Sequence, residues 1–146
     1  MEIAGQRIVV IGGAGLIGSH VVEGLLEEDV REVVVFDNFA RGVRANLEGA
    51  LRDSRCRVFE LGGDICQVDI LDRAVEGADA VVHLAALWLL HCHDFPDSAF
   101  EVNIRGTFNV LQACVRHRVK RFIYSSSASV YGDAVREPMD LSLIHI

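Results

Sequence analysis

Apolar runs and amphipathic stretches alternate along the chain. Runs of apolar residues predict five β-strands, at 7–11, 32–36, 57–61, 80–84 and 120–125. Between them, apolar residues at helical spacing predict helices at 16–28, 45–52, 69–76 and 97–117. We expect Asp69 to cap the third helix and Gly77 to end it. The fourth helix carries five apolar residues on one side, Phe100, Ile104, Phe108, Leu111 and Val115.

This order of strands and helices predicts an α/β protein with a Rossmann-type doubly wound parallel sheet. Helices cover both faces of such a sheet, which gives three layers. Right-handed crossovers place the switch in strand order between the first and fourth strands. A ligand is therefore expected beyond the carboxyl ends of the strands, in a sheet that is truncated after the fifth strand.

Three glycines follow the first predicted strand directly. Gly12 and Gly15 separate the apolar run 8–11 from the helix predicted at 16–28, and Gly18 lies in the first turn of that helix. Glycines allow a sharp turn and a close approach to a pyrophosphate, and the helix N-terminus offers free N–H groups. This context favours a dinucleotide site over the alternative, a tight turn that binds nothing.

An acidic residue ends the second predicted strand. Asp37 lies 19 residues after Gly18, where a carboxylate accepts hydrogen bonds from the adenosine ribose of NAD. A carboxylate there repels a 2′-phosphate, which favours NAD over NADP. Arg41 and Arg44 are close by and offer that phosphate a partner. In the alternative interpretation, Asp37 only forms a turn before Asn38.

Polar and small residues also follow the other three strands. Asp64 and Ile65 come after the third strand, where they suit the edge and face of an adenine. The stretch 83–86 ends the fourth strand with small residues that let the backbone approach a cofactor, while His83 itself is expected to be structural. The serines at 125–129 end the fifth strand. They suit a substrate oxygen or form an ordinary polar loop.

The stretch 91–94 contains two histidines, a cysteine and an aspartate. Their spacing on a predicted loop, with no third partner elsewhere, makes a poor metal site, so we expect no metal. Trp88, Leu89 and Leu90, just before it, line a pocket or fill core.

Composition narrows the setting of the protein. The formal net charge is −7 without a basic stripe, which argues against a nucleic-acid partner. The N-terminal residues lack a signal-peptide pattern, and the longest apolar run, 84–90, is too short to span a membrane. Four cysteines without close pairs indicate reduced thiols in a cytoplasmic protein, with Cys66 and Cys114 buried.

Six stretches together resemble one family. They are VIGGAGLIGSH (10–20), DNF (37–39) with Gly42, GDI (63–65), HLAA (83–86), NIRGT (103–107) and SSSASVYG (125–132). In this order and spacing they resemble the extended short-chain dehydrogenase/reductase family. The similarity is to its NAD-dependent epimerase/dehydratase group, typified by UDP-glucose 4-epimerase.

The resemblance implies an enzyme that keeps NAD bound and transiently removes a hydride from a carbon of a nucleotide sugar. It gives Ser127 the catalytic role of hydrogen bonding the reacting oxygen, and it implies a homodimer when the enzyme has its full length. The positions expected to contact the cofactor are Gly12, Gly15, Leu16, Ile17, Gly18, Asp37, Asn38, Asp64, Ile65, Leu84, Ala85, Ala86, Asn103 and Ser125.

The sequence departs from the family pattern in three places. The general base of the family, Tyr-x-x-x-Lys, is absent, because Lys120 precedes Ser127 and Tyr131 has Val135 four residues on. Trp88 and its apolar neighbours stand where the best-known epimerases place a lysine near the nicotinamide. Residues 141–146 no longer resemble the family.

These departures shape the expected organisation. We expect residues 1–140 to form a partial NAD(P)-binding domain and residues 141–146 to be a non-native tail. The substrate lobe and the tyrosine–lysine pair then belong to the missing half of a longer enzyme, and the isolated chain is expected to be inactive. Two other functions remain open, a reductase or dehydrogenase of a non-sugar substrate and a non-catalytic NAD-binding sensor.

Overall fold

The computed structural model describes residues 3–133 and residue 138, and it contains a five-stranded parallel sheet. The strands are β1 (Arg7–Ile11), β2 (Glu32–Phe36), β3 (Cys56–Val58), β4 (Ala80–His83) and β5 (Arg121–Tyr124), in the order β3-β2-β1-β4-β5. The predicted fold class and the switch between β1 and β4 are confirmed. β3 is shorter than the predicted strand. The proposed tail at 141–146 lies outside the described residues.

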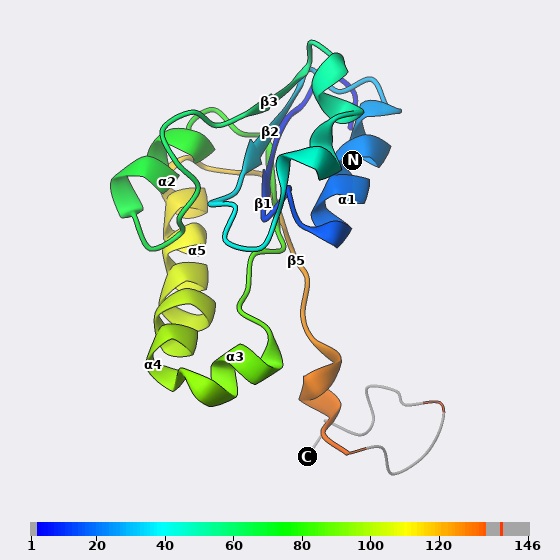
Figure 1. Ribbon diagram of the computed structural model, residues 1–146. Coiled ribbons are helices and arrows are strands. Elements are labelled where there is room, and N and C mark those ends of the chain that lie inside the picture. Colours follow the sequence, from blue (N-terminus) through cyan, green and yellow to red (C-terminus); the bar gives the residue numbers. More distant parts are fainter. Residues whose placement is uncertain (1–2, 134–137, 139–146) are drawn as a thin grey trace.

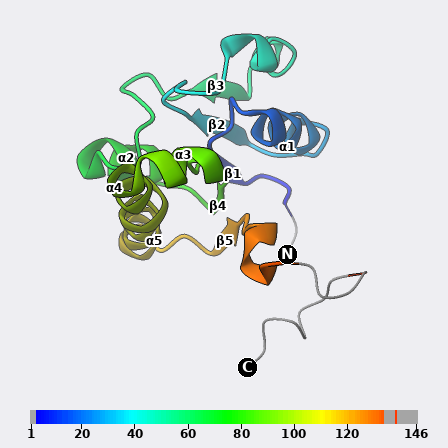
Figure 2. The same ribbon diagram turned by 60° about the horizontal axis from the view of Figure 1, so that its bottom comes forward.

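Alternate residues of the strands pack against helices on opposite faces of the sheet. Val9 and Ile11 point into a core closed by α2 (Val68–Val75) and α5 (Thr107–Arg116). Ile8 and Val10 point into a second core, closed by α1 (Leu16–Leu26) and the turns after β2. Figure 2 shows α1 on one side of the sheet and α2, α4 and α5 on the other. The three layers therefore follow from strands that are apolar on both faces.

Local sequence explains where the helices differ from prediction. The helix predicted at 45–52 is two 3₁₀ turns, η1 (Arg44–Leu47) and η2 (Ala50–Arg52). α2 begins after Gln67, and Asp69 lies inside its first turn, so the prediction that Asp69 is the N-cap is wrong. Gly77 adopts a positive φ of 70° just after the C-cap, which suits the end of a helix.

The long helix predicted at 97–117 begins at Pro96 and changes geometry along its length. It comprises α4 (Pro96–Ala99), a π-helical segment η3 (Phe100–Gly106) and α5, and α3 (Leu89–Asp94) precedes it where a loop was predicted. Its buried side consists of Gly106, Val110, Ala113 and Cys114. The five apolar residues predicted on one side, Phe100, Ile104, Phe108, Leu111 and Val115, are all exposed. The outward apolar side of this helix is called here the α5 face.

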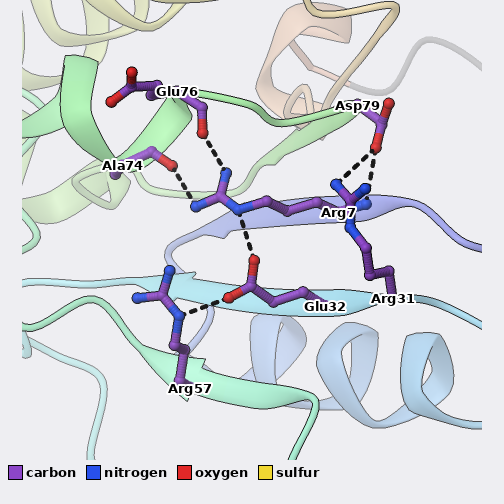
Figure 3. A network of polar contacts seen from close by, with 7 residues as sticks. All are labelled: Arg7, Arg31, Glu32, Arg57, Ala74, Glu76 and Asp79. Carbon is purple, nitrogen blue, oxygen red and sulfur yellow. Dashed lines mark hydrogen bonds and ion pairs between the residues drawn. The ribbon is translucent and has the colours of Figure 1, made fainter.

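A network of charged side chains joins the amino ends of the strands (Figure 3). The Arg7 guanidinium binds Glu32 at 2.7 Å and also donates to the carbonyl oxygens of Ala74 and Glu76 at the end of α2. Asp79 accepts the Arg7 N–H at 3.0 Å and lies near the side chains of Arg31 and Lys120. The network fastens α2 and β4 to β1 at the end of the sheet opposite the glycine turn.

Candidate dinucleotide site

The glycine turn after β1 is built from main chain packed on main chain. Gly12 has a φ of 83°, and a Cβ on it would lie 2.7 Å from the backbone nitrogen of Ala85. A Cβ on Gly18 would overlap the carbonyl oxygen of Gly12. Glycine is therefore required at both positions, for the turn itself and for the close packing of α1 on the turn. We call this turn the glycine cradle, because it stays open only as long as these positions carry no side chain.

The amino end of α1 opens beside this turn (Figure 1). Gly15 caps the helix without a side chain, and no acidic residue lies in the first turn. The first N–H groups of the helix and its positive dipole end therefore suit an anion. Leu16 and Ile17, both predicted contacts, are 75% and 65% exposed at this opening.

Asp37 connects the end of β2 to the glycine turn. One carboxylate oxygen accepts the Ala14 N–H at 2.8 Å, and the other accepts the Phe39 N–H at 2.8 Å. The turn-forming alternative is thus present in the structure. It does not exclude a ligand, because each carboxylate oxygen has a second lone pair.

A cavity of about 460 Å³ lies beyond the ends of β2 and β3. Asp37, Asn38 and Asp64 line it, so the structure brings together three predicted contacts from two loops. Asn38 and Asp64 also accept backbone N–H groups of their own loops, at 3.0 and 2.9 Å. Its size suits a nucleoside.

Ile65 does not line this cavity. Its side chain is 3% exposed, and a Cβ on Gly106 would lie 2.5 Å from its Cδ1. The expectation that its side chain meets the face of an adenine does not fit this packing, because the side chain belongs to the core. Only its main chain is left for a ligand.

The segment after β4 packs on the other side of the turn. Leu84 belongs to the core beside α1, and Ala85 touches Gly12. Asn103, a predicted contact, donates to and accepts from the main chain of Leu87, at 3.0 and 2.7 Å. It therefore holds the loop in place, and both ends of its amide are occupied. Ala86 is exposed nearby.

His83 is fully buried at the end of β4, as a structural residue would be. Its Nε2 lies 3.0 Å from the Thr107 hydroxyl, and its ring packs near Phe122 and Tyr124. Burial lowers the pKa of His83 to about 4, so the imidazole is neutral at physiological pH.

The serines after β5 are exposed. The Ser125 N–H donates to the carbonyl oxygen of His83, which continues the sheet toward β4. The Ser127 hydroxyl accepts the Ser129 N–H at 3.1 Å and caps the 3₁₀ turn η4 (Ala128–Tyr131). The catalytic role of Ser127 and the contact role of Ser125 remain predictions.

Several residues that the sequence singled out lie outside the turn. Within residues 3–133 and 138, no three His, Cys, Asp or Glu side chains lie together in a way that suits a metal ion. Trp88, Leu89 and Leu90 are exposed and do not fill core. Cys114 is buried and Cys66 half-buried, and all four cysteines are free. None of the described helices is long and apolar enough to cross a bilayer.

The segment after β2, from Gly42 into η1, makes contacts that the sequence did not predict. A Cβ on Gly42 would lie 2.7 Å from the main chain of Ala14, and the Asn46 amide donates to the Ala14 carbonyl oxygen at 2.8 Å. Arg44 lies over the Phe39 ring and lines the cavity. Gly42 stood in the motif that carried the resemblance, but nothing in the spacing indicated that this loop packs on the glycine turn.

Strand order, the turn and the cavity define a dinucleotide-binding domain of the Rossmann class. The chain belongs to the 3-beta hydroxysteroid dehydrogenase/isomerase family, whose model matches residues 9–140.

Relatives and solved structures agree with this class. The chain is 37% identical to UDP-glucose 4-epimerase of Mus musculus, over 92% of this chain and 41% of the relative. It is also 37% identical to 3 beta-hydroxysteroid dehydrogenase type 7 of Homo sapiens, over 87% of this chain and 34% of the relative. A crystal structure of DesIV, a dTDP-glucose 4,6-dehydratase from Streptomyces venezuelae with NAD and TYD bound, is 36% identical with a TM-score of 0.82. It is matched over 89% of this chain and 42% of that chain.

These matches confirm the resemblance to the epimerase/dehydratase group. The chain spans about two fifths of the length of the epimerase that it matches.

The two glycines of α1 give a matched test of the cradle. We expect Gly18→Ala to weaken NAD binding at least about tenfold and to lower the free energy of unfolding, because the new Cβ overlaps Gly12. A Cβ on Gly24 meets nothing within 4 Å, so Gly24→Ala is expected to raise that free energy by up to about 1 kcal/mol. Calorimetry and urea unfolding measure both. Equal effects of the two variants would contradict this packing.

Burial of His83 predicts a pH-dependent stability. Its folded pKa lies below its unfolded value of 6.5, so the unfolded chain binds more protons as the pH falls. Stability is full above pH 6.5 and decreases below it, by about 2 kcal/mol between pH 7 and pH 5. His83→Gln, which cannot titrate, is expected to lose most of this decrease in urea unfolding. An unchanged pH profile in that variant would assign the effect to other groups.

Proposed function

We propose that this chain is the cofactor-binding part of an NAD-dependent epimerase or dehydratase of nucleotide sugars. The single observation that carries the cofactor proposal is the glycine cradle at the switch point, joined to Asp37 by the Ala14 hydrogen bond. NAD is the cofactor that the relatives support, since the similar dehydratase structure holds it.

The residues present fit this cofactor. The α1 amino end and the turn N–H groups suit its diphosphate, and the cavity lined by Asp37, Asn38 and Asp64 suits its adenosine. When bound, NAD supplies a hydride acceptor and donor. Ser127 lies on the loop after β5, which β1 and β4 separate from β2, and its hydroxyl can hydrogen bond a substrate oxygen. The Tyr-x-x-x-Lys base of the family does not follow Ser127 in this sequence.

A hydroxysteroid dehydrogenase is the second candidate. The matching family is named for that activity, and one relative, human 3 beta-hydroxysteroid dehydrogenase type 7, carries the same name. The exposed apolar residues Trp88, Leu89 and Leu90 beside the site suit an apolar substrate better than a sugar. We place it second because the epimerase match covers more of this chain.

We further propose a homodimer, with the α5 face as its contact surface. Five large apolar side chains lie exposed along one helix, 40–73% accessible. A two-fold axis would pack this face against its own copy and remove the apolar area from water. Because the net charge is negative, we do not propose nucleic acid as a partner. The cytoplasmic location stays a prediction.

Asp37 tests the cofactor proposal. Asp37→Ala removes the carboxylate and its bond to Ala14, so NAD affinity is expected to fall about tenfold, and the preference for NAD over NADP to narrow. Asp37→Asn retains one acceptor oxygen without the charge and isolates the electrostatic part. Calorimetry with both coenzymes measures these changes. Unaltered preference in both variants would remove Asp37 from coenzyme selection.

Turnover by the protein translated from its complete gene tests the activity. We expect epimerisation or dehydration of a UDP- or dTDP-sugar, with NAD held throughout, and no NAD-dependent oxidation of 3-hydroxysteroids. Ser127→Ala is expected to lower kcat about a hundredfold and leave NAD affinity unchanged, because the proposed ligand contact of the serine is to the reacting oxygen and not to NAD. Steroid oxidation without sugar turnover would favour the second candidate. Binding of NAD without either activity would favour a sensor.

A further inference from the structure

Two side chains meet, from the two loops that pack on the glycine turn. The Arg41 guanidinium lies 5.3 Å from the centre of the Trp88 ring. Arg41 precedes Gly42, which packs on Ala14, and Trp88 follows Ala85, which packs on Gly12. In Figure 1 the loop after β2, in cyan, and the segment after β4, in green, come together beside the end of β1. The contact, called here the Arg41–Trp88 bridge, therefore spans the switch point of the sheet.

Both ends of the bridge are fixed to the structure. The Val43 N–H donates to the Ala14 carbonyl oxygen at 3.2 Å, which holds the loop that carries Arg41. The Asn103 amide holds Leu87, next to Trp88, through two hydrogen bonds. Arg41 is thus presented by an anchored loop and steadied by an anchored ring.

The hydrogen-bond donors of Arg41 are not used by the rest of the described chain. No hydrogen bond or ion pair joins its guanidinium to another residue between 3 and 133. A guanidinium that stacks on a ring uses its face and leaves its N–H edges free, and these edges match phosphate oxygens well. Trp88 therefore orients a cation without neutralising it.

Few cationic side chains are available near the glycine turn to bind an anion. Residues 12–18 carry no charged side chain, and in the segments 37–46 and 84–90 the cations are Arg41 and Arg44. Arg44 lies over Phe39 and lines the adenosine cavity. Arg41 does not line that cavity, and its own loop packs on the glycine turn through Gly42 and Val43.

We propose that Arg41, oriented by Trp88, binds the diphosphate of the dinucleotide as a positioning cation above the glycine turn. The proposal rests on the proposed function, in that it takes the bound diphosphate to be that of NAD. Arg44 would in contrast serve the adenosine end. The two arginines then have separate roles, although the sequence offers both equally to a phosphate.

The test compares ligands with and without a diphosphate, in the protein translated from its complete gene. Calorimetry with NAD, ADP-ribose, adenosine and UDP is expected to show that Arg41→Met weakens NAD and ADP-ribose by about tenfold, and leaves adenosine and UDP unchanged. The loss of one phosphate contact should also reduce the salt dependence of NAD binding. Arg44→Met is the matched control, for which adenosine and NAD weaken together.

Trp88 is tested through Arg41. Trp88→Ala is expected to weaken NAD about threefold in the parent protein and not at all in the Arg41→Met background, because the ring acts by orienting the guanidinium. Trp88→Phe keeps an aromatic face and should retain most of the affinity. Arg41 and Trp88 are exposed, so circular dichroism and urea unfolding are expected to match the parent protein.

The outcomes separate the two proposals. A parent protein that binds neither NAD nor ADP-ribose would overturn the proposed function itself. A parent that binds NAD, with Arg41→Met unchanged, would overturn only the role of Arg41. If Arg41→Met lowered the affinity for UDP instead of NAD, Arg41 would bind the sugar nucleotide. If it lowered the affinities for adenosine and NAD equally, Arg41 would support the adenosine end. Either result contradicts a cation on the NAD diphosphate.

Discussion

Close main-chain packing at the end of β1 governs the whole site. Gly12 lies against Ala85, Gly42 lies against Ala14, and α1 starts within reach of the Gly12 carbonyl oxygen. Because glycine has no Cβ, the main chains of three segments from different parts of the sequence can pack within a few ångströms of one another. The loops after β2 and β4 are thereby brought to the two sides of one turn, and the proposed contacts to the diphosphate depend on that convergence.

Polar groups at the two ends of the sheet have different roles. At the amino ends of the strands, Arg7, Glu32 and Asp79 satisfy one another and close the structure. At the carboxyl ends, the N–H groups of α1 and the Arg41 guanidinium point to no such partner within the described chain. Charges that are paired stabilise, whereas donors left unpaired at a turn of this kind suit a ligand. An acidic protein can in this way keep a local site for an anion.

The sequence predicts the sheet and the turn well, for physical reasons. Strands that are buried on both faces are continuous apolar runs, as in β1 and β2, and a turn that requires glycine shows it directly in Gly12 and Gly18. Which side of the long helix faces the sheet was harder to predict, because the helix has two apolar sides. Small residues, Gly106, Ala113 and Cys114, face the sheet, while the larger ones lie exposed. Periodicity finds a stripe, but it does not say which stripe faces the core.

Contacts between distant loops were beyond prediction. Asn103 was assigned to the cofactor from its motif, yet its amide fixes Leu87. Ile65 followed an acidic residue in a pattern suited to adenine, yet its side chain fills the core below Gly106. In both cases the motif marks the right region, and only packing decides whether the side chain faces the ligand or supports the loop. The Arg41–Trp88 bridge has no motif at all, since 46 residues of sequence separate its partners.

Asp37 shows why coenzyme choice depends on position more than on a count of charges. Counting charges alone, two arginines near one carboxylate would favour binding of the 2′-phosphate of NADP. The carboxylate, however, is held by the Ala14 and Phe39 N–H groups at the end of β2, inside the cavity proposed for the ribose. The Arg41 guanidinium lies over the Trp88 ring and does not line that cavity, so of the two arginines only Arg44 lines it. A fixed negative charge inside the cavity acts on a 2′-phosphate at close range, while a cation outside the cavity acts at longer distance. The geometry therefore favours NAD, although the local sequence carries more positive than negative charge.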